Sequence, residues 1–559
     1  MSKKIWLKHY DEGVPHSLRP YPECTLLDII SDTVQQRPDH QAMFFKGASI
    51  SYSELDKVSN ALAAALVETG IRKGDRVALL LPNSPQMILG EIGIWKAGGI
   101  AVPMNPMYTE TELEYALNEC GAETVVVLTP FYWKVKAIQS QTSVKRVIAT
   151  NIKEHLPLFK RFLFTVLKEK EGGHRISLNA GDVWFQDLLS AWAKAPRPQI
   201  SIKPADLAIF LFTGGTTGPP KCAVGTHHAL VMAGMQINSW FRVVLDEWKD
   251  PIMLNMPLFH VYGQVGAMTT GLVGHYPMIL IPDPRDLDEV VDTIKKLRPA
   301  LLPGVPTLFV SLSKHPKVQA NQTALASLKL CVCGATPLLA EAKQRFEALT
   351  GGRIIEAYAL TESMIAAVST PVKGTYKPGS VGIPAPDVEL RIVDVETGEI
   401  ELNPTEIGEI LVRAPQLMAG YWQNPTETAR TIRDGWLYTG DLGYLDEDGY
   451  MFIVDRKKDL IKPSGFQVWP REVEEVIAAH PSVAEVGVAG VPDDLQGEAV
   501  KAWVVLHDDH SISIDELHLY CRTKLAAYKV PKYIEFRASL PKTAIGKILR
   551  RELNSFQNR

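Results

Sequence analysis

Cysteine is scarce in this sequence, and the few cysteines show no spacing typical of a metal site. The 559 residues contain six of them, namely Cys24, Cys120, Cys222, Cys331, Cys333 and Cys521. Such a low content is typical of proteins in a reducing compartment. Cys331 and Cys333 stand two apart in an apolar run, so we interpret them as packing residues on one face of a strand. Because no second Cys/His pair completes a zinc pattern, we expect a cytoplasmic protein without a structural zinc site.

Long apolar segments are also absent. No stretch reaches the roughly 18 uncharged apolar residues of a membrane-spanning helix. The nearest, Val265–Ile281, contains His275 and several glycines. Met1–Pro15 contains lysines but no apolar core of a secretory signal. We therefore expect neither a membrane span nor a secretory signal.

Neither sign of charge is in large excess. Lys and Arg number 59 and Asp and Glu 63, which gives a formal net charge of −4. This balance argues against a nucleic-acid binder with a strongly basic surface, so we expect no nucleic acid among the partners. A local basic pocket for phosphates remains compatible with it.

The sequence does contain the composition and element order of a large α/β protein. Hydrophobic residues make up 46% and charged residues 22%, the proportions of a soluble globular protein, and the length corresponds to about three or four domains. Apolar runs alternate with helical patterns, the first of which we expect to be capped by Ser53 and to end at Gly70. We expect strands at Arg76–Leu81, Ile100–Pro103, Thr124–Leu128, Ala300–Leu302, Leu328–Val332 and Arg353–Glu356, and further helices at Pro85–Ala97 and Glu110–Asn118. This order predicts sheets with parallel pairs covered by helices.

The pattern changes after Gly379. Strands expected at Val388–Asp394, Glu409–Val412 and Tyr450–Val454 form a compact β unit. After the charged segment Asp455–Asp459, helices alternate with strands, at Pro470–Ala479, Ala484–Ala489, Ala499–Leu506, Ile514–Leu525 and Tyr533–Arg537. We therefore predict a large α/β N-terminal domain, residues 1–455, with β-sheets flanked by helices plus the small β unit. A smaller α+β C-terminal domain, residues 456–559, follows it.

One segment of the irregular region Val144–Ile200 mixes basic and large apolar residues. Leu156–Lys170 reads LPLFKRFLFTVLKEK. Such a segment can lie on an anionic membrane surface. The more ordinary alternative is a helix packed against its own protein.

Phe212–Lys221, FTGGTTGPPK, is the strongest local signal for a binding site. It follows the apolar run Leu207–Phe212 and therefore begins at a strand end. Glycines let a backbone approach a ligand and expose N–H groups, and threonines and lysine add donors; these residues are Thr213, Gly214, Gly215, Thr216, Thr217, Gly218 and Lys221. A flexible surface turn is the alternative, but the Pro-Pro-Lys ending favours phosphate binding. The segment is not a Walker A loop, because two prolines precede the lysine.

With five further segments, this loop resembles the motifs of the adenylate-forming superfamily, which includes the acyl-CoA synthetases. In the family's order, the segments are Met256–Gly263 (MPLFHVYG), Ile355–Ser363 (IEAYALTES), Gly435–Asp441 (GWLYTGD), Asp455–Asp459 (DRKKD) and Pro541–Lys547 (PKTAIGK). Within the superfamily, TGGTTG, Gln416–Trp422 (QLMAGYW) and DRKKDLIKPSGF look most like bacterial long-chain-fatty-acid–CoA ligases. The resemblance spans essentially the whole chain.

The resemblance implies a reaction in two steps. ATP and a long-chain fatty acid give an acyl adenylate and pyrophosphate, and coenzyme A then displaces AMP, so ATP, Mg²⁺ and coenzyme A are expected. By resemblance, Lys547 contacts the carboxylate and the α-phosphate, and Thr361 contacts the α-phosphate. Glu362 binds Mg²⁺, with Thr213 as a further candidate ligand.

The resemblance also implies the remaining parts of the site. Asp441 accepts hydrogen bonds from the ribose hydroxyls, with Arg456 beside it. The adenine slot and its strand comprise Gly334, Ala335, Thr336, Glu356, Ala357 and Tyr358, and the acyl side comprises His260, Val261, Tyr262 and Gly263. His260 is expected to position the acyl group rather than to act as a general base; a core histidine is the alternative.

The segment Asp455–Asp459 is expected to be a hinge. By resemblance, the C-terminal domain rotates between the two steps and exchanges the face bearing Lys547 for a coenzyme A face. Lys458 matches the pivot, and Ser464, Gly465 and Phe466 match the loop that then enters the site. The alternative is a rigid charged connector.

Two positions depart from the family pattern. Cys222 and Ala359 stand where the family has glycine, so each adds a Cβ near the nucleotide site. If either needs a positive φ, strain of roughly 1–2 kcal/mol follows. Cys222 would be sensitive to oxidation if it were exposed.

Other functions stay open at the level of sequence. The fold would also suit a ligase for medium-chain or aromatic acids, or transfer of the adenylate to a carrier protein. A non-catalytic acyl or nucleotide sensor is a further alternative. The two positions that lack the family's glycine support it, whereas the presence of Lys547 and Glu362 argues against it. We also consider a homodimer and a peripheral contact with the inner face of the membrane.

Overall fold

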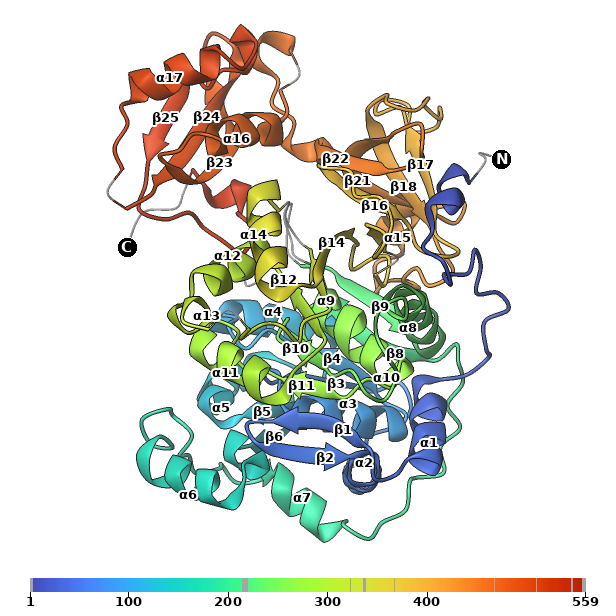
Figure 1. Ribbon diagram of the computed structural model, residues 1–559. Coiled ribbons are helices and arrows are strands. Elements are labelled where there is room, and N and C mark those ends of the chain that lie inside the picture. Colours follow the sequence, from blue (N-terminus) through green and yellow to red (C-terminus); the bar gives the residue numbers. More distant parts are fainter. Residues whose placement is uncertain are drawn as a thin grey trace.

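The computed structural model describes residues 4–213, 220–321, 323–334, 338–365, 367–466, 468–508, 510–543 and 546–554. Figure 1 shows a large α/β lobe with two smaller parts above it, a β unit on the right and a C-terminal domain on the left. These are the parts that the sequence predicts. No helix in these ranges is long and apolar enough to span a bilayer.

The first sheet has eight strands in the order β19-β9-β8-β4-β3-β5-β6-β7. Its strands are β3 (Arg76–Leu80), β4 (Ile100–Pro103), β5 (Thr124–Leu128), β6 (Arg146–Thr150), β7 (Val183–Trp184), β8 (Leu207–Phe212), β9 (Cys222–Thr226) and β19 (Gly420–Tyr421). The run from β8 to β7 is parallel, whereas β9 is antiparallel to both its neighbours. The helices around it include α2 (Tyr52–Glu68), α3 (Pro85–Lys96), α4 (Glu110–Cys120) and α5 (Tyr132–Ile138). The predicted parallel α/β arrangement is therefore confirmed.

The N-terminal cap of α2 is Ser51, not Ser53 as predicted. The Ser51 hydroxyl accepts from the Glu54 amide, and the Glu54 carboxylate accepts from the Ser51 amide. This reciprocal pair satisfies two backbone donors, which a cap at Ser53 would not.

The second sheet joins the large lobe to the β unit. Its order is β17-β18-β21-β22-β16-β15-β14-β13-β12-β10-β11-β1-β2, with β20 beside β21. The part in the lobe consists of β1 (Gln41–Phe45), β2 (Ala48–Ser51), β10 (Ile252–Leu254), β11 (Met278–Leu280), β12 (Leu301–Gly304), β13 (Leu330–Cys333) and β14 (Arg353–Tyr358). The β unit contains β15 (Val368–Ser369), β16 (Ser380–Pro384), β17 (Glu389–Val393), β18 (Gly408–Arg413), β20 (Ile432–Arg433), β21 (Trp436–Leu445) and β22 (Met451–Arg456). The β unit thus continues the sheet.

Helix α3 lies at the centre of the lobe. All twelve of its residues are buried, and its side chains belong to one apolar cluster with residues of β3, β8, β10 and β11. The other helices of the lobe are α1 (Leu26–Gln36), α7 (Phe185–Ala191), α8 (His227–Phe241), α9 (Val261–Gly263), α10 (Thr270–Val273), α11 (Leu287–Leu297), α12 (Pro306–Lys314), α13 (Pro316–Gln319) and α14 (Ala340–Thr350), while α15 (Pro425–Thr431) lies at the β unit. This packing holds the strand ends of both sheets in fixed positions.

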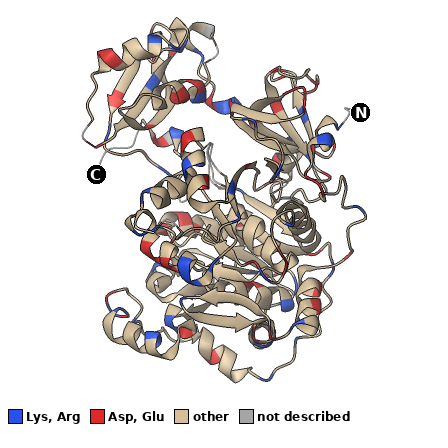
Figure 2. Ribbon diagram, viewed as in Figure 1, with Lys and Arg blue, Asp and Glu red and all other residues tan. Residues whose placement is uncertain are grey.

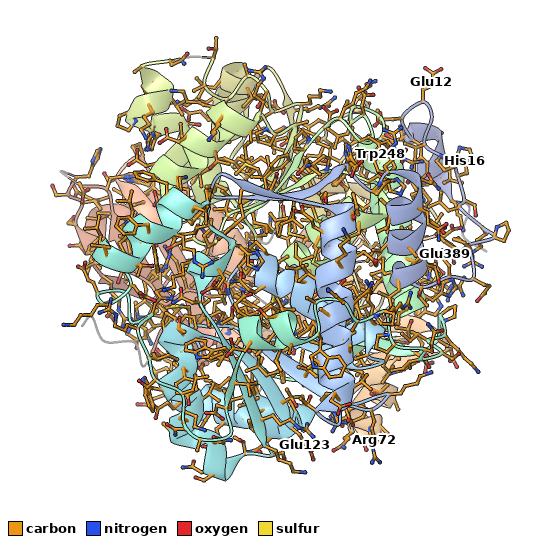
Figure 3. All side chains as sticks on the ribbon, turned by 90° about the horizontal axis from the view of Figure 1, so that it is seen from below. Glu12, His16, Arg72, Glu123, Trp248 and Glu389 are labelled. Carbon is orange, nitrogen blue, oxygen red and sulfur yellow. The ribbon has the colours of Figure 1, made fainter. Side chains whose placement is uncertain are left out.

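The N-terminal segment runs along the β unit. Lys4 pairs with Glu389 at 3.0 Å, and the Ser17 hydroxyl donates to Asp387 at 2.7 Å. In Figure 3, Glu12, His16 and Glu389 lie along one margin of the molecule. The segment therefore ties the β unit to the lobe.

The C-terminal domain has its own core. Strands β23 (Val483–Asp493), β24 (Gly497–Leu506) and β25 (Tyr533–Phe536) form a separate sheet with helices α16 (Pro470–Ala478) and α17 (Ile514–Arg522). Val473, Ile477, Val488, Val504 and Leu517 are buried together. The strand before this domain, β22, ends at Arg456, and Lys457–Asp459 form a single 3₁₀ turn. The basic start of this turn lies between the domain and the β unit (blue in Figure 2).

Helix α6 (Leu158–Leu167) occupies the segment with mixed basic and apolar residues. None of its residues is buried, and it projects from the end of the lobe that is farthest from the C-terminal domain (Figure 1). The more ordinary alternative, a helix packed against its own protein, holds for one side of α6 only: Lys160 Nζ donates to the Lys46 carbonyl at 2.7 Å, whereas Leu158, Phe159 and Phe162 on the other side are exposed.

Candidate active site

A cleft of about 2430 Å³ lies between the large lobe and the C-terminal domain. It brings together predicted site residues from both parts, namely Thr213, Lys221, His260, Val261, Tyr262, Gly334, Glu356, Ala357, Tyr358, Thr361, Glu362, Asp441, Arg456, Lys458 and Lys547. The structure does not place Gly263, Ser464 or Phe466 along it, and the surroundings of Gly465 are not described. Gly214, Gly215, Thr216, Thr217, Gly218, Ala335 and Thr336 lie outside the described residues.

The predicted phosphate loop joins two antiparallel strands, β8 and β9. The Thr213 amide donates to the Lys221 carbonyl at 2.8 Å, and the Lys221 amide donates to Thr213 Oγ1 at 3.2 Å. These bonds fix the base of the loop, whose residues 214–219 are not described. A Walker A loop is followed by a helix, whereas this loop is followed by strand β9. The structure therefore agrees with the prediction that the loop is not a Walker A loop.

Lys221 and Glu362 are connected through Tyr421. The Tyr421 hydroxyl donates to Glu362 Oε1 at 2.9 Å, and the Lys221 ammonium lies 5.0 Å from the Tyr421 ring centroid. Lys221 also pairs with Glu427. Sequence reasoning missed Tyr421 and Glu427, although Tyr421 lies in QLMAGYW, a segment that we used only to assign the subgroup.

Asp441 is held from two sides at the nucleotide end of the cleft. The Tyr358 hydroxyl donates to Asp441 Oδ2 at 2.7 Å, and Arg456 Nε lies 3.0 Å from Asp441 Oδ1. Asp441 and Arg456 are register partners on β21 and β22, which explains why two distant segments converge. Burial raises the pKa of Tyr358. A carboxylate has about four lone-pair sites, so Asp441 can still accept ribose hydroxyls.

The strands at the predicted adenine slot are tightly packed. A Cβ added to Gly334 would lie 3.3 Å from Tyr262 Cε1, so the absence of a side chain leaves room for that ring. Glu356 accepts from the Tyr376 hydroxyl at 3.1 Å, and burial raises its pKa. Ala357 pairs with Ser369 across β14 and β15. Glu356 is therefore a buried, hydrogen-bonded side chain at the edge of the cleft.

His260 caps the short helix α9 on the acyl side. Its Nδ1 accepts from the Tyr262 amide at 3.2 Å, and burial lowers its pKa to about 4. The ring is therefore neutral near pH 7, with Nδ1 as acceptor and the proton on Nε2. This tautomer donates from Nε2, which agrees with a positioning role and not with a general base. A Cβ on Gly263 would lie 2.3 Å from the Pro257 carbonyl oxygen, so the close approach of the two backbone segments requires glycine here. Gly263 does not line the cleft.

A buried acid that the sequence analysis missed lies behind His260. Glu91 on α3 is fully buried and accepts from Gln264 Nε2 at 2.7 Å. Burial raises the pKa of Glu91 to about 8. Gln264 begins a π-helical segment, Gln264–Thr269, a conformation that is frequent at functional sites.

Two lysines reach the cleft from the hinge side. Burial, and then the nearby Arg456 guanidinium, lower the pKa of Lys547 to about 8, and the same two causes lower that of Lys458 to about 8. The Lys547 amide donates to Thr543 Oγ1 at 3.1 Å. A Cβ on Gly546 would lie 3.9 Å from Thr307 Oγ1 on α12. The loop bearing Lys547 therefore lies against the large lobe.

Arg550 connects the C-terminal tail, the segment after Lys547, to the hinge Asp455–Asp459 by ion pairs. Its guanidinium contacts Asp455 at 2.7 Å, Asp459 at 3.0 Å and Glu474 at 2.6 Å. The Asp455 carboxylate also accepts from the Arg471 amide at 2.7 Å. The carboxylates raise the pKa of Arg550 although burial acts the other way.

The predicted coenzyme A loop faces away from the cleft. Ser464 has a φ of 49°, and its amide donates to the Gln496 carbonyl at 2.9 Å. The Phe466 side chain is 55% exposed and stacks on Tyr528 with ring centroids 4.8 Å apart. In this arrangement Lys547, and not Phe466, lines the cleft.

Neither departure from the family pattern produces the strain considered above. Cys222 and Ala359 are not among the described residues with positive φ. Cys222 is 1% exposed, and burial raises its pKa well above the ordinary value. The strain considered above required a positive φ, and the sensitivity to oxidation required an exposed Cys222. Neither is found.

A divalent cation would have few protein ligands in this cleft. Within the described residues, no three His, Cys, Asp or Glu side chains form a metal-binding group. Glu362 uses one carboxylate oxygen for Tyr421 and keeps the other. Mg²⁺ bound to a nucleotide needs only one or two carboxylates besides the phosphates, so Glu362 and Thr213 fit this ion.

The two-domain fold and the cleft are those of a nucleotide-binding enzyme, and the chain belongs to the AMP-binding enzyme family. The family model AMP-binding enzyme matches residues 30–422, and the model AMP-binding enzyme C-terminal domain matches residues 472–547. The predicted superfamily is therefore confirmed.

Among its relatives, a long-chain-fatty-acid–CoA ligase of Bacillus subtilis (strain 168) is 40% identical over 555 residues, covering 99% of this chain and 98% of the relative. The structure of ATP-bound MatB from Rhodopseudomonas palustris has a TM-score of 0.82 at 30% identity, over 96% of this chain and 99% of that chain. Apo MatB has a TM-score of 0.72 at 30% identity, over 95% and 99%. The arrangement of the present chain is thus more similar to the ATP-bound form.

Proposed function

We propose that this protein converts a long-chain fatty acid, ATP and coenzyme A into acyl-CoA, AMP and pyrophosphate through an acyl adenylate. The observation that carries the proposal is the meeting of Lys547 from the small domain with Glu362 and Asp441 of the large domain in one cleft. The relative that is 40% identical over almost the whole chain supports the long-chain acid.

In the first step, the chain must bring two anions together. Lys547 and Lys221 supply positive charge at the carboxylate and phosphates, and Thr361 adds a hydroxyl. Asp441 and Arg456 hold the ribose, while neutral His260 donates from Nε2 toward the acyl carboxylate. Burial of these groups strengthens their electrostatic effect.

Glu362 and Thr213 would hold Mg²⁺, which would neutralise charge on the phosphates. Tyr421 is a positioning residue: its hydroxyl fixes one oxygen of Glu362 at 2.9 Å and leaves the other for the cation.

The second step needs an activated anhydride and a thiol, and no covalent enzyme intermediate. Lys547 has no role in it, so the C-terminal domain rotates at Lys458 and brings Ser464, Gly465 and Phe466 to the cleft. The exposed Phe466–Tyr528 stack offers a flat apolar surface for coenzyme A.

ATP–pyrophosphate exchange with acids of graded chain length tests the substrate. We expect the highest kcat/KM with long-chain acids. A maximum with medium-chain or aromatic acids would replace the long-chain assignment, and exchange absent with every acid would favour the sensor. Coenzyme A added after the acid and ATP should release AMP; release only with a carrier protein would change the acceptor.

Lys547→Ala tests the division between the two steps. We expect loss of acyl-adenylate formation of about 100-fold or more, because the charge at the α-phosphate is lost. Thiolysis of supplied acyl adenylate should stay within about twofold, since this step does not use the lysine. Equal loss in both steps would contradict domain rotation.

For its place in the cell, we propose the cytoplasm, with peripheral contact at a lipid surface from which fatty acids are taken. A homodimer stays a prediction that sedimentation of the purified protein tests.

A further inference from the structure

Six apolar side chains lie exposed on one face of α6. The exposed fractions range from 37% to 85% for Leu158, Phe159, Phe162, Leu163, Val166 and Leu167. At 3.6 residues per turn these positions fall within about 180° of the helix circumference. Exposed apolar faces of this kind in soluble proteins mark contacts with partners or membranes.

The opposite side of α6 is fixed to the lobe. The Phe164 ring packs edge-on against His174 with centroids 5.1 Å apart, and Arg161 pairs with Glu154 at 2.6 Å. Lys160 Nζ donates to the Lys46 carbonyl at 2.7 Å. The apolar face therefore points to solvent because the helix is held in that orientation by its other side.

Basic residues surround this face. Between residues 151 and 175 the chain has six Lys or Arg and three Glu, whereas the whole chain has an excess of acidic residues. Lys160, Lys168 and Lys170 are exposed. An apolar face with Phe and Leu and a basic border is the pattern of a helix that lies in a membrane interface.

We propose that α6 docks on an anionic lipid bilayer, with its apolar face in the acyl region and its lysines at the headgroups. A second copy of this chain fits less well, since two such faces would bring like charges together. A ten-residue helix is also only about 15 Å long, too short for the roughly 800 Å² per partner of a stable interface. This inference rests on the proposed peripheral contact at a lipid surface and deepens it by assigning that contact to α6.

The position of α6 is compatible with domain movement. Figure 1 places α6 and the C-terminal domain at opposite ends of the molecule. Docking by α6 would therefore leave the C-terminal domain away from the bilayer and free to rotate.

Co-sedimentation with vesicles tests the proposal. The variant is Phe159→Ser/Phe162→Ser/Val166→Ser, and the matched control is Ile400→Ser/Leu495→Ser/Leu519→Ser, whose side chains are equally exposed elsewhere. On equimolar phosphatidylglycerol and phosphatidylcholine, we expect the α6 variant to bind about tenfold more weakly than the wild type, and the control to bind like it. Lys168→Gln/Lys170→Gln should also weaken binding, and pure phosphatidylcholine should bind more weakly. Equal binding by wild type and α6 variant would overturn the proposal.

Two further measurements distinguish insertion of α6 into lipid from self-association of the protein. The emission of the eleven native tryptophans is removed by subtracting the wild-type spectrum from that of Phe162→Trp. This difference emission should move to shorter wavelength on the same vesicles, and an unchanged difference spectrum would place α6 outside the lipid. A lower sedimentation coefficient of the α6 variant without vesicles would instead assign the face to self-association. Exchange of pyrophosphate with a short soluble acid should be the same in wild type and variant, so failure of lipid docking is distinguishable from failure of the proposed function.

Discussion

Burial has two consequences for Lys547, the residue to which we assign the catalytic charge. Its position among Arg456, Asp441 and the cleft walls costs hydration, and its pKa falls to about 8. A weakly hydrated cation interacts more strongly with phosphates in a buried site. Because of the same burial, Lys547 loses its charge in a pH range in which the activity of the enzyme can be measured.

The first prediction is a falling limb in the pH profile of adenylate formation. A lysine carries its charge below its pKa, so kcat/KM for ATP should fall about tenfold per pH unit above pH 8. In Lys547→Arg the guanidinium stays charged, and the limb should disappear although the rate is lower. Because the pKa of Lys458 is also about 8, Lys458→Gln is the control and should keep the limb. A limb unchanged in Lys547→Arg would assign it to another group.

Cys222 gives a second prediction at this scale. It lies in β9 with its side chain buried, so Cys222→Gly should lower the free energy of unfolding by about 1–2 kcal/mol through lost packing and greater unfolded-state entropy. The adenylation rate should stay within about twofold, since no positive φ is relieved. Ala359→Gly is the matched control in the cleft. Thermal unfolding and pyrophosphate exchange measure both effects, and a markedly faster Cys222→Gly enzyme would restore the strain hypothesis.

At the scale of elements, the chain was most predictable where structure is local. Strands such as Thr124–Leu128 are continuous apolar runs and were placed correctly. The pairing of β14 with β15 and β16, which joins the β unit to the lobe, depends on residues far apart and leaves no local pattern.

The position of some residues along the cleft could be predicted in the same way. Motif residues such as Glu362 and Asp441 could be assigned by resemblance. Tyr421 reaches Glu362 only because the two-residue strand β19 pairs with β9, and the sequence does not encode that contact locally. The exposure of α6 could not be predicted either, because the same pattern suits a packed helix.

The connection between tail and hinge gives the third prediction. Arg550→Ala leaves Asp455, Asp459 and Glu474 without their shared cation, which should lower the free energy of unfolding of the C-terminal domain by about 2–3 kcal/mol. The loop bearing Lys547 should then be held less firmly, so adenylation falls more than thiolysis. Lys532→Ala, which removes the partly exposed lysine of an ion pair with Asp493 on the same domain, is the control. Equal loss of both half-reactions would show that Arg550 does not act through the lysine loop.

At the scale of the whole molecule, the global charge says little about the partners. The net charge is −4, yet ATP and coenzyme A are polyanions that meet cations gathered in one cleft from two domains. The basic residues around α6 form a second region whose charge differs in sign from the net charge, and this region lies at the opposite end of the molecule from the C-terminal domain. We therefore expect the local distribution of charge, and not the net charge, to determine binding at these two regions, and the two can be tested separately.

The last prediction concerns the movement of the domains against each other. In the present arrangement a Cβ at position 546 would lie 3.9 Å from Thr307 Oγ1. The two positions are therefore in contact, and we expect Thr307→Cys and Gly546→Cys to form a disulfide after a small adjustment of the loop bearing Lys547. Gly546 has a φ of 79°, so the cysteine there costs about 1–2 kcal/mol, and the single variants measure this cost.

The oxidised double variant should still form acyl adenylate and pyrophosphate, because the disulfide retains the arrangement in which Lys547 lines the cleft. It should release little acyl-CoA, since Ser464–Phe466 cannot replace the lysine loop while the bond holds, and a reductant should restore the product. The oxidised single variants control for damage by the oxidant. Mass spectrometry should demonstrate the disulfide in the oxidised double variant. If this oxidised enzyme produced acyl-CoA as fast as the same variant treated with a reductant, both steps would proceed in one arrangement, and the hinge would be a rigid connector.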